Sequence, residues 1–171
     1  MPHVKPLTID DAPAKSQPIL KAIEKKFGKS MNIFCTAAYQ PDVLGGLTQI
    51  NDGIRNDLPE KLRELAYFKA SQVNHCDYCM HYHKQASKQV GLSDEQLQAT
   101  ESFQSSDAFD DQEKAVLEYA EQLTKSAKVD AGVVSKLQEF LDEKQLVSLA
   151  ATVALANFTN RFNHGLDIQL P

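Results

Sequence analysis

Two cysteines and a histidine stand at spacings that suit thiol chemistry. Cys76 and Cys79 are three residues apart, and His83 follows Cys79 by four. On a helix, residues three or four apart share one face, with Cβ atoms about 5–6 Å from each other. The two thiols could then form a disulfide, and the imidazole could accept the proton of Cys79. The sequence therefore predicts a redox-active dithiol that carries its own base.

The place of this pair in the chain favours its ionisation. The cysteines fall in the first turn of an expected helix over about residues 76–90, which ends at Gly91. Partial burial disfavours a thiolate, but the helix dipole and a protonated His83 both favour it. We expect Cys79, one turn from His83, to be the activated thiol. Cys76, nearer the open helix end, should be the more accessible one.

A carboxylate on the preceding helix is placed to orient the histidine. Only a short break around His75 separates the two helices, so they should pack as an antiparallel hairpin. Glu64 lies about eleven residues before this turn and His83 about eight after it. At about 1.5 Å per residue, the two side chains should reach comparable depth. Glu64 would then fix the tautomer of His83 and increase its basicity.

The elements that must position these residues are all predicted to be helices. Apolar residues recur with helical periodicity, and no run shows sustained alternation, so the sequence predicts an all-α fold of about seven or eight helices. They are expected at about 16–27, 41–55, 57–74, 76–90, after Ser93, at 110–126, after Asp130 and at 143–164. Capping pairs are expected at Asp57 with Glu60, Ser93 with Gln96, and Asp110 with Glu113.

Composition excludes several classes of protein. The 171 residues suit a single domain, 1–171, and 42% hydrophobic with 24% charged residues is ordinary for a globular chain. The net charge is −5 and no basic cluster exceeds Lys25-Lys26, so no nucleic-acid partner is expected. No apolar stretch predicts export or membrane insertion. Three cysteines do not form a secreted disulfide framework, which favours a reducing, cytoplasmic location.

The motif resembles a known family. Glu64, then Cys76-x-x-Cys79-x-x-x-His83, a helix rich in Lys, Gln and Ala, and Gly91-Leu92-Ser93 are similar to the alkylhydroperoxidase AhpD-like branch of the carboxymuconolactone decarboxylase family over about residues 57–100. The chain keeps both cysteines, which the true lactone decarboxylases lack. It has Tyr78 where the best-studied AhpD-like members carry a second histidine.

The resemblance implies a thiol-dependent peroxidase of antioxidant defence that needs no metal or other cofactor. Cys79 would attack a hydroperoxide and become a sulfenic acid, and Cys76 would resolve it to a disulfide. His83 and Glu64 would relay protons. The resemblance also implies a dithiol reductant, for example a lipoyl protein, and a homo-oligomer.

Two other functions fit the same residues. A disulfide oxidoreductase for a protein or lipoyl partner would use the same dithiol. A zinc-stabilised, non-catalytic interaction module would join Cys76, Cys79 and His83 to His75 or His81. However, His81 projects about 100° or more from the Cys79/His83 stripe, and one helical turn seldom supplies four tetrahedral ligands. The peroxidase is therefore the leading hypothesis.

Some residues outside the motif have open roles. Cys35, within an apolar segment, is expected in the core. Polar residues near the end of the last helix could line a pocket mouth or a subunit contact, and exposed polar positions would explain them equally well; these residues are Asn157, Asn160, Arg161 and Asn163.

Overall fold

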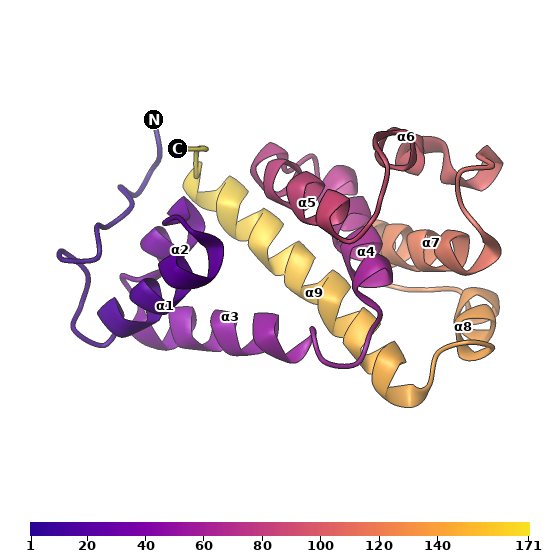
Figure 1. Cartoon of the computed structure of the whole chain (residues 1–171), viewed down its shortest axis with the longest axis horizontal. Helices are drawn as coiled ribbons and strands as arrows, with labels where there is room; N and C mark the ends of the chain where they lie inside the picture. Colours follow the sequence, from indigo (N-terminus) through magenta and orange to yellow (C-terminus); the bar gives the residue numbers. More distant parts are fainter. The chain divides into compact units, whose positions relative to one another are not determined.

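The computed structural model describes all residues, 1–171, and consists of helices without strands (Figure 1). The elements in chain order are α1 (Gln17–Phe27), α2 (Asn32–Ala37), α3 (Pro41–Gly53), α4 (Glu60–Val73), α5 (Asp77–Gln89), α6 (Asp94–Ala99), the 3₁₀ helix η1 (Thr100–Ser105), α7 (Asp111–Ser126), α8 (Ala131–Gln138) and α9 (Glu143–Leu166). The all-α prediction is confirmed. Helix α2 was not predicted, because six residues are too few to show helical periodicity. No helix has the length and apolar character needed to cross a bilayer.

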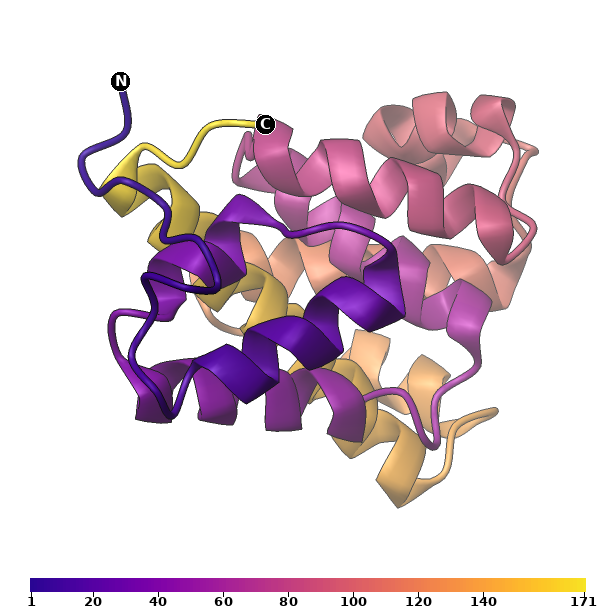
Figure 2. The ribbon, with the colours of Figure 1, turned by 60° about the vertical axis from the view of Figure 1, so that its left-hand side comes forward.

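The chain forms two compact units, of which the first comprises Met1–Asp52 and Arg161–Pro171. In this unit α1 lies beside α3 (Figure 2), and Lys26 near the end of α1 pairs with Asp52 near the end of α3 at 2.6 Å. The Ser16 hydroxyl donates to the carbonyl of Ala38 at 2.8 Å. The buried apolar side chains of these helices include Leu20, Ile23, Ile33, Phe34, Leu44 and Leu47.

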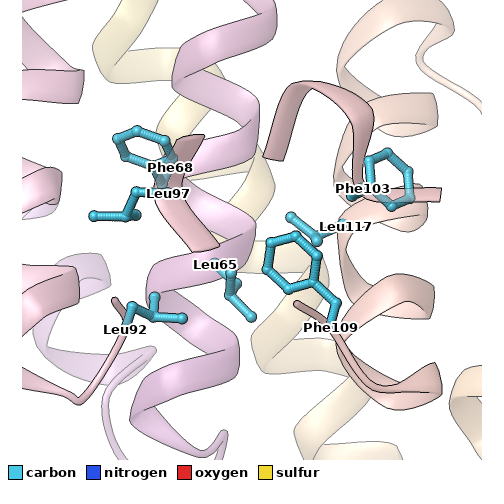
Figure 3. Packing of buried hydrophobic residues seen from close by; sticks show 7 residues of the cluster. All are labelled: Leu65, Phe68, Leu92, Leu97, Phe103, Phe109 and Leu117. Atoms are coloured by element: carbon cyan, nitrogen blue, oxygen red, sulfur yellow. The ribbon is translucent and has the colours of Figure 1, made fainter. Parts of the chain in front are cut away.

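The second unit, Gly53–Asn160, is built around α4. Helix α4 packs against both α5 and α7, and every residue from 63 to 71 is buried. Leu65 and Phe68 of α4 join an apolar cluster (Figure 3) whose other members are Leu92, Leu97, Phe103, Phe109 and Leu117. Helical periodicity in the sequence predicts one apolar stripe on this helix, made of Leu62, Leu65, Ala66, Ala70 and Val73. In the structure α4 is buried on all sides over residues 63–71. The polar side chains of Glu64 and Ser71 are buried on the side away from the stripe, whereas Lys69 lies over Phe103 of the apolar cluster.

Helix ends follow the sequence signals in most places. The capping boxes of Ser93 with Gln96 and of Asp110 with Glu113 are both formed. Gly91 adopts the left-handed conformation, with φ of 91°, after α5.

The capping pair predicted at Asp57 and Glu60 is wrong. The N-cap of α4 is Pro59, which makes no side-chain cap bond. Asp57 stands two residues before that N-cap, so its carboxylate is too early in the chain to cap the first turn. An unpredicted reciprocal pair opens α9 instead: the Gln145 N–H donates to Asp142 Oδ1 at 2.8 Å, and the Asp142 N–H donates to Gln145 Oε1 at 3.1 Å.

Candidate active site

The two helices that carry the predicted site are joined by a tight turn. His75 follows α4 in the left-handed region, with φ of 54°. The N–H of Cys76 donates to the Ser71 carbonyl at 2.9 Å, and the N–H of His75 donates to the Gln72 carbonyl at 3.0 Å. These two bonds form a Schellman motif, which satisfies the last carbonyls of α4. The left-handed position is occupied by histidine rather than by glycine, the residue that usually marks such a turn in a sequence. The sequence therefore indicated the break only through the helical segments on either side of it.

The residue that closes this turn also opens the next helix. Cys76 is the N-cap of α5, and its sulfur accepts a hydrogen bond from the N–H of Cys79 at 3.3 Å. The two cysteines form a disulfide, with their Cα atoms 5.3 Å apart. Their sulfurs therefore lie at the end of α5 where the helix dipole favours an anion. The prediction that Cys76 is the more accessible is wrong: Cys76 is 2% exposed and Cys79 is 4% exposed, because Cys76 closes the turn at the end of α4.

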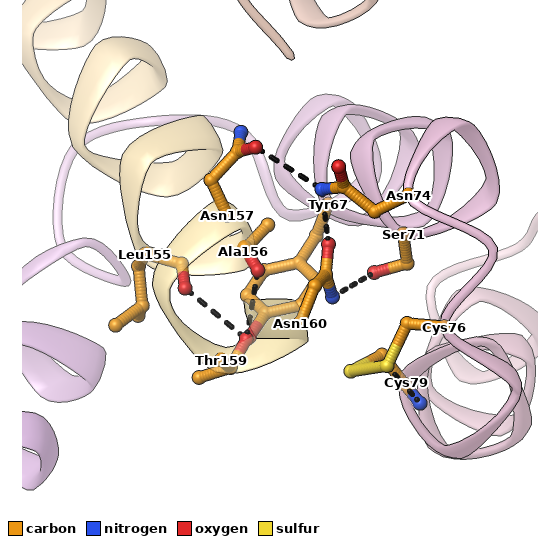
Figure 4. The surroundings of a disulfide bond; sticks show 10 residues. All are labelled: Tyr67, Ser71, Asn74, Cys76, Cys79, Leu155, Ala156, Asn157, Thr159 and Asn160. Atoms are coloured by element: carbon orange, nitrogen blue, oxygen red, sulfur yellow. Dashed lines mark hydrogen bonds between the residues drawn. A yellow bond between two sulfur atoms is a disulfide. The ribbon is translucent and has the colours of Figure 1, made fainter. Parts of the chain in front are cut away.

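A network of amide side chains holds this turn against α9 (Figure 4). Asn74 donates to Asn157 Oδ1 at 3.0 Å and to Asn160 Oδ1 at 2.8 Å. Asn160 in turn donates to the Ser71 hydroxyl at 3.1 Å. The interpretation of the late α9 residues as exposed polar positions is therefore wrong for Asn160 and also for Asn163, since both are buried. At Asn160, burial is compensated by these bonds to the α4 segment.

The structure brings Glu64 and His83 together across the α4–α5 hairpin. Glu64 Oε2 lies 2.8 Å from His83 Nδ1. The other carboxylate oxygen, Oε1, accepts from the Arg63 guanidinium at 3.1 Å. Glu64 and Arg63 are almost fully buried, and His83 is partly exposed. The two residues thus meet at comparable depth, as the residue count from the turn predicted.

The electrostatic balance keeps Glu64 charged. Burial on its own raises the pKa of the Glu64 carboxyl, but the charge and hydrogen bond of His83, together with the Arg63 guanidinium, outweigh burial. The net pKa of Glu64 lies below its ordinary value, so it is a carboxylate at neutral pH. A carboxylate only accepts hydrogen bonds, so His83 Nδ1 must donate. Neutral His83 therefore keeps its lone pair on Nε2, the nitrogen available to act as a base.

Of four further side chains near this site, the sequence analysis singled out only Asn160, as a residue that could line a pocket mouth or a subunit contact. Arg63 supports Glu64, and Tyr67 stacks on the His83 ring. Asn74 and Asn160 fix the turn that carries the cysteines. Arg63 and Tyr67 could have been found from the sequence, because they carry polar groups at positions of the helix whose neighbours are apolar. The Asn74–Asn160 contact joins residues 86 positions apart, which no local pattern reveals.

Four other residues that the sequence analysis considered take no part in the Glu64–His83 bond; they are His75, His81, Tyr78 and Cys35. His75 and His81 are exposed, and His81 Nε2 lies 3.1 Å from the amide of Gln85. No group of three or more His, Cys, Asp or Glu side chains has the arrangement of a metal site. The Tyr78 ring lies 5.0 Å from that of Tyr82. Cys35 is buried as expected, and burial, together with the charge of Glu24, raises the pKa of its thiol.

The arrangement as a whole can cycle two electrons. The cysteine pair can be reduced to two thiols or closed to a disulfide, and its helix also carries His83 one turn from Cys79. His83 has a buried carboxylate on one ring nitrogen and a basic position on the other. Such a site can deprotonate a thiol and return the proton to a leaving group.

Known proteins resemble this chain in sequence and in fold. A model of the carboxymuconolactone decarboxylase family matches residues 41–122. The uncharacterized protein YdfG of Bacillus subtilis is 28% identical over 103 residues, which cover 59% of this chain and 70% of YdfG. The debrominase Bmp8 has the same fold, with a TM-score of 0.84 and 24% identity over 98% of this chain and 91% of Bmp8.

An Agrobacterium tumefaciens protein, described as of the antioxidant-defence AhpD type, also shares the fold. Its TM-score is 0.73, and its identity is 22% over 79% of this chain and 94% of that protein. At these identities, the two solved structures establish the fold and not the reaction.

Proposed function

Given that this chain belongs to the carboxymuconolactone decarboxylase family and has the AhpD-like fold, we propose that it is a thiol-dependent peroxidase that reduces hydroperoxides through its cysteine pair. The observation that carries the proposal is the bond of 2.8 Å between Glu64 of α4 and His83 of α5. Helix α5 also has the two cysteines at its start. A dithiol with a carboxylate-oriented base is suited to attack a weak, polarisable bond such as O–O.

The cycle starts from the reduced pair. Neutral His83 takes the proton of Cys79, and the resulting thiolate attacks one oxygen of ROOH. The O–O bond breaks, Cys79 becomes a sulfenic acid, and RO⁻ leaves as ROH with the proton held by His83. Cys76 then attacks the sulfenic sulfur, which forms the disulfide and releases water. An external dithiol, for example a dihydrolipoyl group, restores both thiols by exchange and is itself oxidised to a disulfide.

The test is peroxide consumption by the reduced chain with dihydrolipoamide, measured beside reduction of insulin disulfides. We expect catalytic loss of an alkyl hydroperoxide, and none with the Cys79→Ser variant. Efficient insulin reduction without peroxide turnover would instead support a disulfide oxidoreductase for a protein or lipoyl partner. One zinc ion per chain after purification without chelator, with no reaction in either assay, would support the zinc-stabilised module.

Reductive dehalogenation is a second candidate, favoured by the fold match to the debrominase Bmp8 over 98% of this chain. A thiolate can also attack a polarisable bromine atom. The carbon would take a proton, Cys76 would displace bromide from sulfur, and the same disulfide would form. Release of bromide from a brominated pyrrole, with two thiols lost per bromide, distinguishes this reaction from peroxide reduction.

A further inference from the structure

One aromatic side chain lies flat against the ring of His83. The centroids of the Tyr67 and His83 rings are 3.6 Å apart, and their planes differ by 13°. Tyr67 stands three residues after Glu64 on α4. The same helix therefore contacts the imidazole twice, through Glu64 at the Nδ1 edge and through Tyr67 over one face. Neither the proposed cycle nor the resemblance gives Tyr67 a role.

Tyr67 is itself fixed in place. Its hydroxyl lies 2.6 Å from the Thr159 hydroxyl of α9 (Figure 4). Thr159 directs its own proton to carbonyls of its helix, those of Leu155 at 3.1 Å and Ala156 at 3.0 Å. Since a hydroxyl has a single proton, a Thr159 proton directed to either carbonyl leaves Tyr67 as the donor to Thr159. The phenol is thus held at its far end while its ring face remains against His83.

The hydroxyl of Tyr67 does not ionise near neutral pH. Tyr67 is 6% exposed, and burial raises the pKa of its hydroxyl far above the ordinary value. Its ring therefore stays neutral. The face of a neutral aromatic ring carries partial negative charge, which attracts a cation stacked on it more strongly than a neutral ring. Protonated His83 gains from this contact, and neutral His83 gains less.

We propose that Tyr67 is a positioning residue that holds the His83 ring and stabilises its protonated form, so that Cys79 ionises at lower pH. The inference deepens the proposed function, because it rests on His83 being the base of the dithiol. Other charged groups near the stacked pair are Glu64 and Arg63 of α4, and Arg55, which precedes that helix. They are unchanged in every variant below, so their contributions cancel in the comparison.

The rival explanation is that Tyr67 only fills space. A packing role predicts that truncation lowers the stability of the fold and leaves the pH dependence of Cys79 unchanged. An electrostatic role predicts that an aromatic face is sufficient, even without the hydroxyl. Tyr67→Leu and Tyr67→Phe separate these possibilities. Tyr119→Leu provides the matched control, because Tyr119 is also a buried tyrosine of this unit, on α7.

The measurement is alkylation of the reduced full chain by iodoacetamide across pH, with each cysteine followed by mass spectrometry. For Tyr67→Leu, we expect the pH of half-maximal Cys79 alkylation to rise by about one pH unit. Tyr67→Phe should stay near the parent profile. Tyr119→Leu should lower the melting temperature and leave the profile unchanged. A folded Tyr67→Leu chain with the parent profile would overturn the proposal.

A second comparison holds the shape of the ring constant in case Tyr67→Leu does not fold. Pentafluorophenylalanine in place of Tyr67 reverses the charge of the ring face, with Tyr67→Phe as its reference. We expect the fluorinated chain to need higher pH for Cys79 alkylation, and equal profiles would reject the proposal whatever Tyr67→Leu shows. Because alkylation needs no peroxide, the expected shifts in a chain without peroxide turnover would overturn only the proposed function. Turnover without the shifts would overturn only the role of Tyr67.

Discussion

Helix α4 has two buried faces that are built in opposite ways. One face contributes Leu65 and Phe68 to an apolar cluster, which many individually weak contacts stabilise together. The other carries Glu64 and Tyr67, each with a defined partner on α5 or α9. Apolar packing tolerates replacement by groups of similar volume, whereas loss of one polar partner leaves the other buried without its bond. The first face should therefore control stability and the second should control reactivity.

The largest expected effect is on the reactive side, at the cysteines. Cys79→Ser should abolish the reaction with peroxide, because no activated thiolate remains one turn from His83. Cys76→Ser should react once and stop as a Cys79 sulfenic acid, since no resolving thiol is present. Mass spectrometry after a short peroxide pulse with dimedone measures both outcomes. A dimedone adduct on Cys76 in the Cys79→Ser chain, with none on Cys79 in the reciprocal variant, would reverse the two roles.

The next effect isolates the apolar face. Leu65 is fully buried, so Leu65→Ala should lower the free energy of unfolding by about 2–5 kcal/mol through lost burial and a residual cavity. Urea denaturation measures this loss. The pH profile of Cys79 alkylation in the folded chain should not move, because Leu65 makes no hydrogen bond or ion pair with Glu64 or His83. A displaced profile would show that the two faces of α4 are not separable.

The matching change on the polar face is Glu64→Gln. It removes the charge that supports protonated His83, and we expect peroxide turnover to fall about tenfold to a thousandfold at neutral pH. Glu95→Gln is the matched control, because Glu95 is an exposed glutamate of the same unit, in the first turn of α6. Turnover at the parent rate in Glu64→Gln would remove the carboxylate from the mechanism, and an equal loss in both variants would point to a general charge effect.

The two faces also differ in how well the sequence predicted them. Helical periodicity located the apolar stripe of α4, and counting residues from the turn placed Glu64 beside His83. Glycines and capping boxes gave most helix ends because they act through local backbone bonds. Helix α2 lacks such signals: Met31 caps it without a side-chain bond, and packing rather than local sequence holds it.

The sequence did not identify the partners that α4 finds on α9. Tyr67 meets Thr159 across 92 residues, and Asn74 meets Asn160 across 86. Such pairs depend on which helices become neighbours, and no spacing rule within one helix encodes that choice. The accessibility of Cys76 was also mispredicted, because the Schellman turn that buries it forms without glycine. The catalytic roles of the four motif residues stay predictions.

The smallest expected effect is a pH dependence of stability that only the polar face should produce. The pKa of Glu64 is lower in the folded chain than its ordinary value, as His83 and Arg63 outweigh the effect of burial. Its contribution to stability is therefore fully present above the ordinary glutamate pKa and is lost as the pH falls through the lower, folded value. In that acidic window the parent should lose stability more steeply than Glu64→Gln, which has no carboxylate to protonate. Urea denaturation of both chains across this range tests the point. Glu121 and Asp94, whose pKa values are also lowered, are present in both chains and cancel. Parallel stability curves through the acidic range would show that the pairing of Glu64 with His83 and Arg63 does not stabilise the fold, and that this face of α4 serves reactivity alone.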